Sequence, residues 1–337
     1  MIDNKSVKQI SENNINYELS ETSAKVIESK NATGDIIIPK FLVYGEENYP
    51  ILEIGKRAFY SSSITSITFP KDSEVHTFGD QCFAICPIKS VVLPPKLFKI
   101  GRGWCVQTPA LEKVVISEGC QNYIFETNAI FTSDKSKLIF CNRNVESFEI
   151  PSPVSVIDIF SFHFQNLKKI TFSENSNLKQ INCSAFRDSS IESIDLPPSL
   201  QNIRDYAFSG CQKLTKVTFQ EGSQLKELAN HCFDNSALVD LTLSGPIAQI
   251  GLGCFRNAKN FKKLTILNEI SVTICKDAFL NVSPDFNLLI RKKSVVDGEG
   301  KAVKISFLQE PNDEILLNIQ HLQDVLDWMV QQPQYAD

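Results

Sequence analysis

The sequence "IRDYAF" at residues 203–208 recurs along the chain with its spacing preserved. "INCSAF" precedes it at 181–186 and "ICKDAF" follows at 274–279, so a small residue and a Phe repeatedly come four and five positions after an aliphatic residue. From Phe162 to Phe279, successive Phe residues are 24, 22, 25, 22 and 24 residues apart. A period of about 20 to 29 residues is typical of leucine-rich repeats and is too short for paired-helix repeats. The sequence therefore predicts a stacked array of short coils.

A second pattern follows each Phe, as in "IESIDL" at 191–196 and "LTKVTF" at 214–219. Apolar residues at the first, fourth and sixth places indicate a short strand with one inward face. No single coil can bury its apolar side alone, and coils stacked at roughly 4.7 to 4.9 Å bring equivalent side chains into contact. The repeated Ile, Ala and Phe residues are therefore predicted to be core, with the Phe rings forming an internal column.

Several of the ten cysteines fall at fixed positions of the same repeat. Cys82, Cys232 and Cys254 occupy the small position that alanine fills in other copies, for example Ala207. A thiol in a narrow buried position behaves as a small hydrophobe, so reduced structural cysteines are expected. In "IGRGWC" at 100–105, Trp104 takes the small position and Cys105 the Phe position, so this coil is expected to open outward or repack.

The stretch "IESIDLPPSLQNIRDYAFSGC" at 191–211 resembles the BspA-like leucine-rich repeats of the Treponema pallidum type, whose coil reads approximately "LxxIxIPxxVxxIGxxAFxxC". The resemblance covers about residues 33–290. It implies an α/β leucine-rich repeat solenoid with a concave parallel sheet and with short turns or 3-10 segments on the convex side. It also implies a non-enzymatic protein, of a kind found in bacteria and mucosal protist parasites and often associated with cell surfaces and adhesion.

Three regions are expected from these patterns: an N-terminal hairpin cap at 1–32, the repeat array at 33–291 and a C-terminal cap at 292–337. A hairpin near 128–144, with "SDKSK" as its turn, is expected to be inserted in the array, either as a decorated coil or as a bulge that contacts a partner. Exposed terminal coils would otherwise present open strand edges, which is why caps are expected.

The C-terminal cap is expected to contain an amphipathic helix at about 313–331, because apolar residues recur there at spacings of 3 and 4. Val325 and Trp328 widen its apolar face. Such a helix could cap the core or could dock a partner.

Charge and motifs exclude several function classes. The formal net charge is -5, without the basic balance expected of a nucleic-acid binder. Neither a secretory signal sequence nor a membrane-length apolar segment is recognisable, so the sequence predicts a cytoplasmic protein, whereas the family resemblance allows the cell surface. The four histidines show no metal-ligand spacing, and "HC" at 231–232 places its cysteine in a buried slot. No catalytic, metal-binding or cofactor-binding residues are expected, and the cofactor prediction is none.

Protein binding is the favoured function, because a solenoid presents the outward residues of its strands as columns. The leading interpretation is adhesion or recognition through this surface, and the alternative is an intracellular scaffold that uses the sheet or the last helix. A protein partner and a monomeric chain are expected; a solvated face without a partner is the competing interpretation of the columns. The candidate residues on the concave face are Lys113, Lys169, Lys216, Lys263, Glu149, Asp195 and Asp240.

Overall fold

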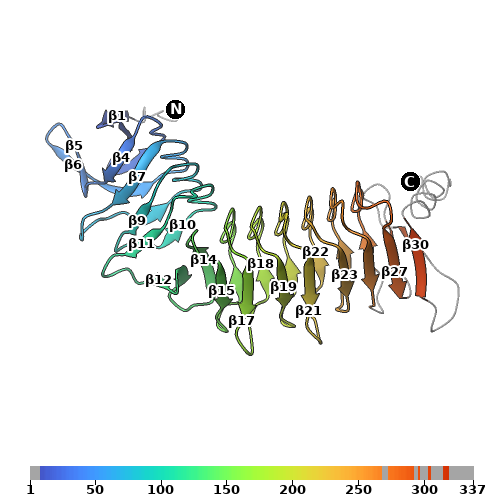
Figure 1. Cartoon of the computed structure of the whole chain (residues 1–337). Helices are drawn as coiled ribbons and strands as arrows, with labels where there is room; N and C mark the ends of the chain where they lie inside the picture. Colours follow the sequence, from blue (N-terminus) through green and yellow to red (C-terminus); the bar gives the residue numbers. More distant parts are fainter. Residues whose placement is uncertain (1–7, 268–271, 292–294, 297–302, 305–313, 319–337) are drawn as a thin grey trace, which may run out of the picture. The chain divides into compact units, whose positions relative to one another are not determined.

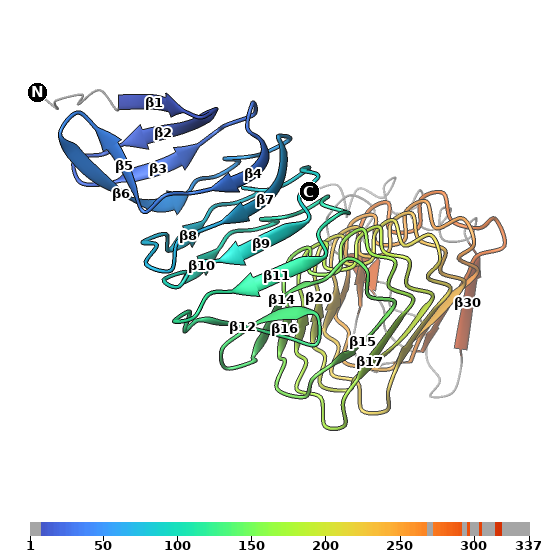
Figure 2. The ribbon, with the colours of Figure 1, turned by 60° about the vertical axis from the view of Figure 1, so that its left-hand side comes forward.

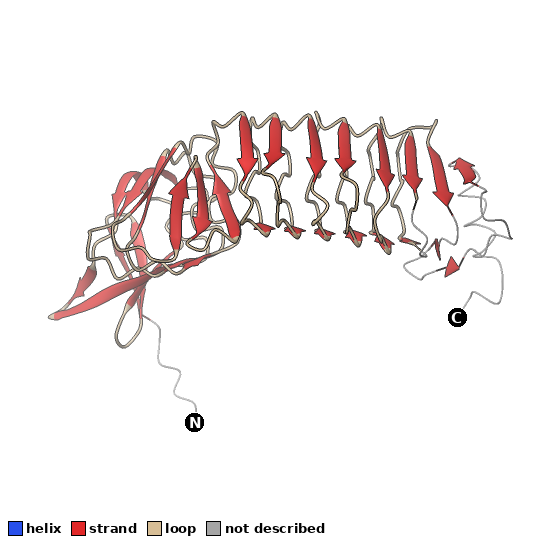
Figure 3. Ribbon diagram, turned by 90° about the horizontal axis from the view of Figure 1, so that it is seen from below, coloured by secondary structure: helices blue, strands red, loops and turns tan. Residues whose placement is uncertain are grey.

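The structure is a computed structural model that describes residues 8–267, 272–291, 295–296, 303–304 and 314–318. It contains two compact units, Met1–Asn144 and Val145–Asp337. Strands make up its regular structure (Figure 1), and the described residues contain no α-helix and no 3-10 segment, as Figure 3 also shows. The predicted α/β class is therefore wrong for the described chain, which is an all-β solenoid whose connecting segments are turns.

In the second unit, the longer strand of each coil joins a sheet that we call the long-strand sheet. Neighbouring strands pair in parallel, as for Ser193–Leu196 beside Lys216–Phe219. Successive side chains of a strand point to opposite faces of the sheet. In the strand Ser193–Leu196 the side chains of Ile194 and Leu196 are buried, while Ser193 and Asp195 are exposed. The parallel strands of this sheet are β15 (Ser147–Ile150), β17 (Lys169–Phe172), β19 (Ser193–Leu196), β21 (Lys216–Phe219), β23 (Asp240–Leu243), β25 (Lys263–Ile266) and β27 (Asn287–Arg291).

A second sheet, which we call the short-strand sheet, runs through the same coils. The repeat pattern alone did not predict it. Each of its strands has two residues, and those that precede a repeat Phe contain the aliphatic residue that opens the "IxxxAF" repeat, so Ile181 pairs in register with Ile203. These aliphatic side chains are buried, which explains why the first position of the repeat is kept apolar. The short strands are β16 (Val156–Ile157), β18 (Gln180–Ile181), β20 (Asn202–Ile203), β22 (Glu227–Leu228), β24 (Gln249–Ile250), β26 (Thr273–Ile274), β28 (Val295–Val296) and β29 (Val303–Lys304), the last antiparallel to β28.

The Phe residues of the second unit form the predicted internal column. Phe186 lies between Phe162 and Phe208, with ring centroids 4.8 and 5.1 Å away and interplanar angles of 2° and 1°. The stacking continues through Phe233 and Phe255 at 5.3 and 5.7 Å. All five side chains are fully buried, and aromatic pairs at these distances add stability beyond their buried area. Figure 2 shows the coils of this unit stacked one behind another.

The turn around each Phe has a fixed backbone conformation. Ser184 and Asp188, two residues either side of Phe186, have positive φ values of 55° and 56°. A turn with positive φ at its third residue reverses the chain tightly, and two such turns bracket the Phe. Between them the Phe186 N–H donates a hydrogen bond to the Ala207 carbonyl of the next coil at 2.8 Å. The turns therefore stack through backbone hydrogen bonds as well as through rings.

The last strand of the long-strand sheet corrects a prediction. Residues Glu314–Asn318 form β30, which pairs antiparallel with β27, whereas a helix was predicted from about 313. The open edge of β27 offers a row of backbone donors and acceptors, and pairing with it overrides the local helical pattern. The rest of the predicted helix, with Val325 and Trp328, lies outside the described residues.

The first unit contains a mixed sheet and a parallel sheet. In the mixed sheet β1 (Lys8–Glu12), β2 (Ile15–Leu19) and β3 (Ala24–Ile27) are antiparallel, and β3 continues in parallel through β6 (Glu47–Ile54), β8 (Thr77–Phe78) and β10 (Lys99–Ile100). β5 (Phe41–Tyr44) pairs antiparallel with β6. The parallel sheet consists of β4 (Thr33–Ile37), β7 (Ser63–Thr68), β9 (Ser90–Leu93) and β11 (Lys113–Ile116).

An antiparallel meander ends the first unit, at the place where the sequence predicted an inserted hairpin. Its strands are β12 (Tyr123–Glu126), β13 (Ala129–Thr132) and β14 (Lys137–Cys141). β12 and β13 are joined by Thr127 and Asn128, whose φ values of 47° and 66° suit a tight two-residue hairpin turn. The predicted array at 33–291 is thus divided after residue 144, a boundary that the repeat pattern did not indicate.

The irregular coil at residues 100–105 repacks instead of opening. Trp104 is 4% exposed and Cys105 is 2% exposed. The Phe83 N–H donates to the Trp104 carbonyl at 2.7 Å, which aligns Trp104 with the small position of the repeat. Its ring meets Phe83 edge-on at 6.1 Å and Phe140 at 5.5 Å. The large and small residues have exchanged positions, and the core stays filled.

Candidate functional site

The predicted surface residues of the second unit lie on the outward face of the long-strand sheet, each on its own strand. Lys169, Lys216, Asp240 and Lys263 each begin a strand and are exposed. The backbone register aligns them in one column, since Lys216 is paired with Asp240 and Asp240 with Lys263. Along this column the charge alternates in sign from Lys216 through Asp240 to Lys263.

Two predicted acidic residues of this face are engaged within the sheet. Glu149 accepts a hydrogen bond from the Ser173 hydroxyl at 2.6 Å. Asp195 accepts bonds from the Thr218 hydroxyl at 2.6 Å and the Gln220 amide at 3.0 Å. These carboxylates tie neighbouring coils together, so their hydrogen-bonding capacity is already partly used.

Asp240 and its neighbours differ from those two acids. Within the part of the chain that the structure describes, the carboxylate of Asp240 and the ammonium groups of Lys216 and Lys263 form no hydrogen bond or ion pair. Adjacent charges that are not paired with each other are available to a ligand, and Arg or Lys beside a carboxylate can bind both signs of charge on a partner.

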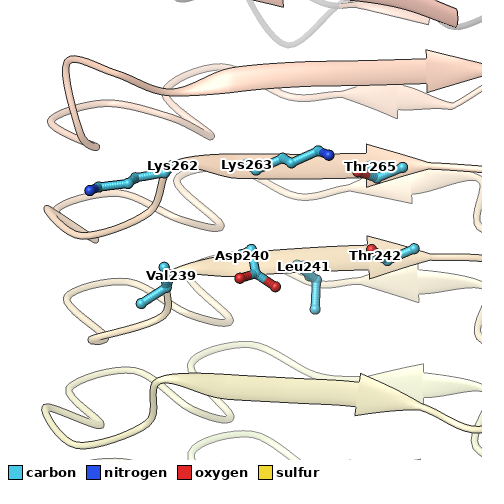
Figure 4. Close-up of a pocket in the computed structure, with 7 residues that line it drawn as sticks. All are labelled: Val239, Asp240, Leu241, Thr242, Lys262, Lys263 and Thr265. Atoms are coloured by element: carbon cyan, nitrogen blue, oxygen red, sulfur yellow. The ribbon is translucent and has the colours of Figure 1, made fainter.

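A shallow groove lies at this point of the column, between β23 and β25. Its volume is about 440 Å³, and Asp240, Thr242, Lys263 and Thr265 line it (Figure 4). Figure 4 shows these side chains on two adjacent strands, with Lys262 and Val239 at the end of the groove where the strands begin. Charged and hydroxyl-bearing side chains from two adjacent strands thus line the same small volume.

Lys113 does not join this column. It is exposed at the start of β11 and pairs in register with Ser90, in the first unit. The predicted set is therefore divided between the two units, and the predicted helix residues Val325 and Trp328 lie outside the described chain.

The turn side of the second unit carries aromatic residues that sequence reasoning missed. The Tyr206 ring stacks on His231 at 4.8 Å, and the Arg187 guanidinium lies 5.7 Å from the Tyr206 centroid. Phe164, two residues after a core Phe, is 46% exposed. Tyr206 and His231 both come two residues before the Phe of their coils, at positive φ. Their shared position in the repeat is the sequence signal that identifies both residues.

The described residues give little support for a catalytic or metal-binding function. They contain no group of three or more His, Cys, Asp or Glu side chains that could hold a metal ion. His231 lies 3.2 Å from Asp234, but the adjacent Cys232 is fully buried and burial raises the pKa of its thiol. A protonated buried thiol is a poor nucleophile. The ten cysteines are free, and Cys82, Cys232 and Cys254 are buried at the small position of the repeat, as predicted. Of the residues described, none form a helix with the length and apolar character needed to span a bilayer.

Comparison with solved structures shows the fold. The chain is similar to a leucine-rich repeat protein from Eubacterium ventriosum, with 16% identity, a TM-score of 0.59, and 89% of this chain and 97% of that chain covered. It also matches the pneumococcal vaccine antigen PcpA at 18% identity and a TM-score of 0.47, covering 82% of this chain and 85% of that one. A leucine rich cell surface protein from Faecalibacterium prausnitzii matches at 19% identity and a TM-score of 0.45, covering 82% and 86%.

No curated protein matches the chain in sequence. The family model "BspA type Leucine rich repeat region (6 copies)" matches residues 46–135, 133–258 and 179–292. These matches together extend from 46 to 292, which is well over half of the 337 residues. The chain therefore belongs to the BspA-type leucine-rich repeat family.

Proposed function

We propose that the protein recognises a protein partner through the outward face of the long-strand sheet in its second unit, and that it acts by binding rather than by catalysis. The observation that carries the proposal is the in-register series Lys216, Asp240 and Lys263, whose charges are not paired within the described chain, beside the groove between β23 and β25. Membership of a repeat family that offers extended surfaces supports this function.

The partner is a segment that carries carboxylates. Three lysines begin strands on this face, against one acid without an internal partner, so the column favours negatively charged side chains. Rim charges of this kind govern association rate and specificity more than affinity. Aromatic side chains, which supply much of the affinity in many interfaces, are absent from this column. A modest affinity that weakens with salt is the expected behaviour.

A charge-reversal experiment tests the binding face. The variant with Lys169→Glu, Lys216→Glu and Lys263→Glu should lose at least about tenfold in affinity for a fluorescent glutamate-rich peptide, measured by anisotropy at low salt. The matched control reverses Lys179, Lys226 and Lys276, which are exposed outside the long strands and change the net charge equally. Equal losses in both variants would mean that the peptide senses only overall charge, and the proposed face would be rejected.

Adhesion at a cell surface is the first biological setting we propose, and an intracellular scaffold is the second. Protease treatment of intact cells of the source distinguishes them, because only a surface-exposed chain is cleaved while a cytoplasmic control protein survives. Cleavage under those conditions supports adhesion. Protection until the cells are lysed supports the scaffold.

A further inference from the structure

The strand β5 in the first unit has one free edge. It pairs antiparallel with β6, and the two strands are joined by Gly45 and Glu46 alone. Among the described residues no strand pairs with the other edge of β5. A strand edge with unpaired backbone groups is a ready template for another strand.

The register shows which backbone groups point to that edge. Tyr44 and Glu47 flank the two-residue turn and form a hydrogen-bonded pair, so the pairs along the hairpin alternate from there. Phe41 and Val43 then fall at the positions that are not hydrogen-bonded to β6. The residue opposite Phe41 is Pro50, which has no N–H to donate, as this alternation requires. The N–H and carbonyl groups of Phe41 and Val43 therefore point toward the free edge.

The side chains of these same two residues are apolar and exposed. Phe41 is 40% exposed and Val43 is 66% exposed, whereas Leu42 between them is 1% exposed and anchors the strand. Proteins commonly protect an edge with a charge, a proline or a bulge at its outward positions. Phe41 and Val43 themselves provide none of these protections, although the Lys40 ammonium group lies 5.2 Å from the Phe41 ring centroid at the start of the strand. Val43 is the more exposed of the two side chains, so the edge is open in its backbone and at Val43.

We propose that β5 pairs antiparallel with β5 of a second copy of this chain across a two-fold axis. The axis passes by Leu42, so Phe41 of one copy faces Val43 of the other, and the reverse pair forms by symmetry. Each of these pairs exchanges two backbone hydrogen bonds, and an aromatic side chain beside a β-branched one is a favourable cross-strand pair. Such an interface is isologous, as in most homodimers. This proposed dimer differs from the monomer that the sequence predicted.

Charge complementarity favours a second copy over an unrelated strand. Lys40 precedes β5 and Glu46 lies in the turn after it, so the strand has a basic start and an acidic end. Antiparallel pairing about the two-fold brings Lys40 of each copy diagonally across from Glu46 of the other. Within its own chain Lys40 lies 2.9 Å from Asp72, a surface pair with an Asp72 side chain that is 69% exposed. That pair leaves the ammonium group able to interact with a second carboxylate.

Sedimentation velocity of the full chain tests this dimer. Over about a hundredfold range of protein concentration, the sedimentation coefficient should rise from the monomer toward the dimer value, because dimer formation follows mass action. Val43→Lys should raise the dimer dissociation constant at least about tenfold, since the lysine faces Phe41 of the other copy. The matched control is Val115→Lys, at a valine on β11 that is 40% exposed. It should leave dimer formation unchanged.

A charge exchange locates the interface. Glu46→Lys should weaken the dimer by placing a lysine near Lys40 of the other copy, and the double variant with Lys40→Glu should restore much of the loss. Thermal melts of every variant confirm that each one is folded. A wild-type chain that stays monomeric over the whole range overturns the proposal. Equal effects of Val43→Lys and Val115→Lys, or no recovery in the double variant, would also overturn this pairing.

Discussion

The second unit and the first unit use the same coil positions but fill them differently. In the second unit the rings of Phe162, Phe186 and Phe208 stack almost parallel, at interplanar angles of 2° and 1°. In the first unit Phe59 and Phe83 stack at 17°, and then Trp104 meets Phe83 edge-on at 80°. The repeat therefore constrains the volume filled in each coil more than the identity of the residue at each position.

Packing explains how both solutions are possible. A folded core keeps nearly crystalline density, so a small position that receives a large ring must be balanced by a large position that receives a small residue. Trp104 and Cys105 make that exchange within one coil, and both are buried. The uniform column of the second unit instead has identical neighbours above and below, and each ring depends on two others.

The largest expected effect comes from breaking the uniform column. Phe186→Ala should lower the free energy of unfolding by about 3 to 5 kcal/mol, through lost burial and the cavity left between Phe162 and Phe208. Chemical denaturation with a spectroscopic probe measures this. Phe164→Ala is the control, because that ring is 46% exposed, and it should cost less than about 1 kcal/mol. Similar losses in the two variants would show that the column has no special role.

The next largest effect on stability is expected at Trp104 and Cys105 in the first unit, where the large and small residues have exchanged positions. Trp104→Ala should cost about 3 kcal/mol, because its ring contacts Phe78, Phe83 and Phe140. Adding Cys105→Phe restores the order of small and large residues found elsewhere, so the double variant should be more stable than Trp104→Ala alone by about 1 kcal/mol or more. The same denaturation experiment measures both variants. A double variant less stable than the single one would mean that the neighbouring coil cannot accept a Phe column.

Much of this architecture could be predicted from the sequence, because repetition displays the same position many times. The period, the inward aliphatic residues and the Phe column all follow from "INCSAF", "IRDYAF" and their equivalents. The outward column of the long-strand sheet followed as well, since strand alternation has only two outcomes. The exposed positions of Lys216 and Lys263 were thus predictable, although their role in binding stays a prediction.

Other features depend on long-range contacts that a periodic pattern does not contain. Ile315 begins the predicted helical stripe, yet it pairs with Ile290 of β27, whose open edge is visible only in the fold. The division after residue 144 and the engagement of Asp195 by Thr218 and Gln220 are of the same kind. For β30 and for Asp195 the deciding partner lies in another coil.

Glycine at the turns provides a smaller test. Gly210 has φ of 73°, and a Cβ built there would overlap the Asp188 carboxylate oxygen. Gly222 has a similar φ of 80° but open space around it. Gly222→Ala should cost about 1 kcal/mol from backbone strain alone, and Gly210→Ala about 1 to 2 kcal/mol more if the carboxylate cannot move. Thermal denaturation of the two variants separates strain from steric contact, and equal losses would show that Asp188 yields freely.

The smallest effect concerns the position two residues after the column Phe, where individual coils differ. One coil of the first unit has Ile85 there at φ of 59°, while two coils of the second unit have Asn257 and Asn281 at 59°, with the Asn281 amide donating to Asn257 at 2.9 Å. A β-branched residue is strained at positive φ, and asparagine tolerates it.

Ile85→Asn should therefore stabilise the chain by up to about 1 kcal/mol, because relief of strain exceeds the loss of packing by a side chain that is 39% exposed. The reverse change, Asn257→Ile, should destabilise it by about 1 to 2 kcal/mol, since it introduces that strain and also removes the hydrogen bonds to Asp234 and Asn281. If thermal denaturation shows a gain in stability for Ile85→Asn and a loss for Asn257→Ile, the same backbone conformation governs both positions. A loss of stability in both variants would instead mean that the Ile85 side chain packs well enough to outweigh its strain.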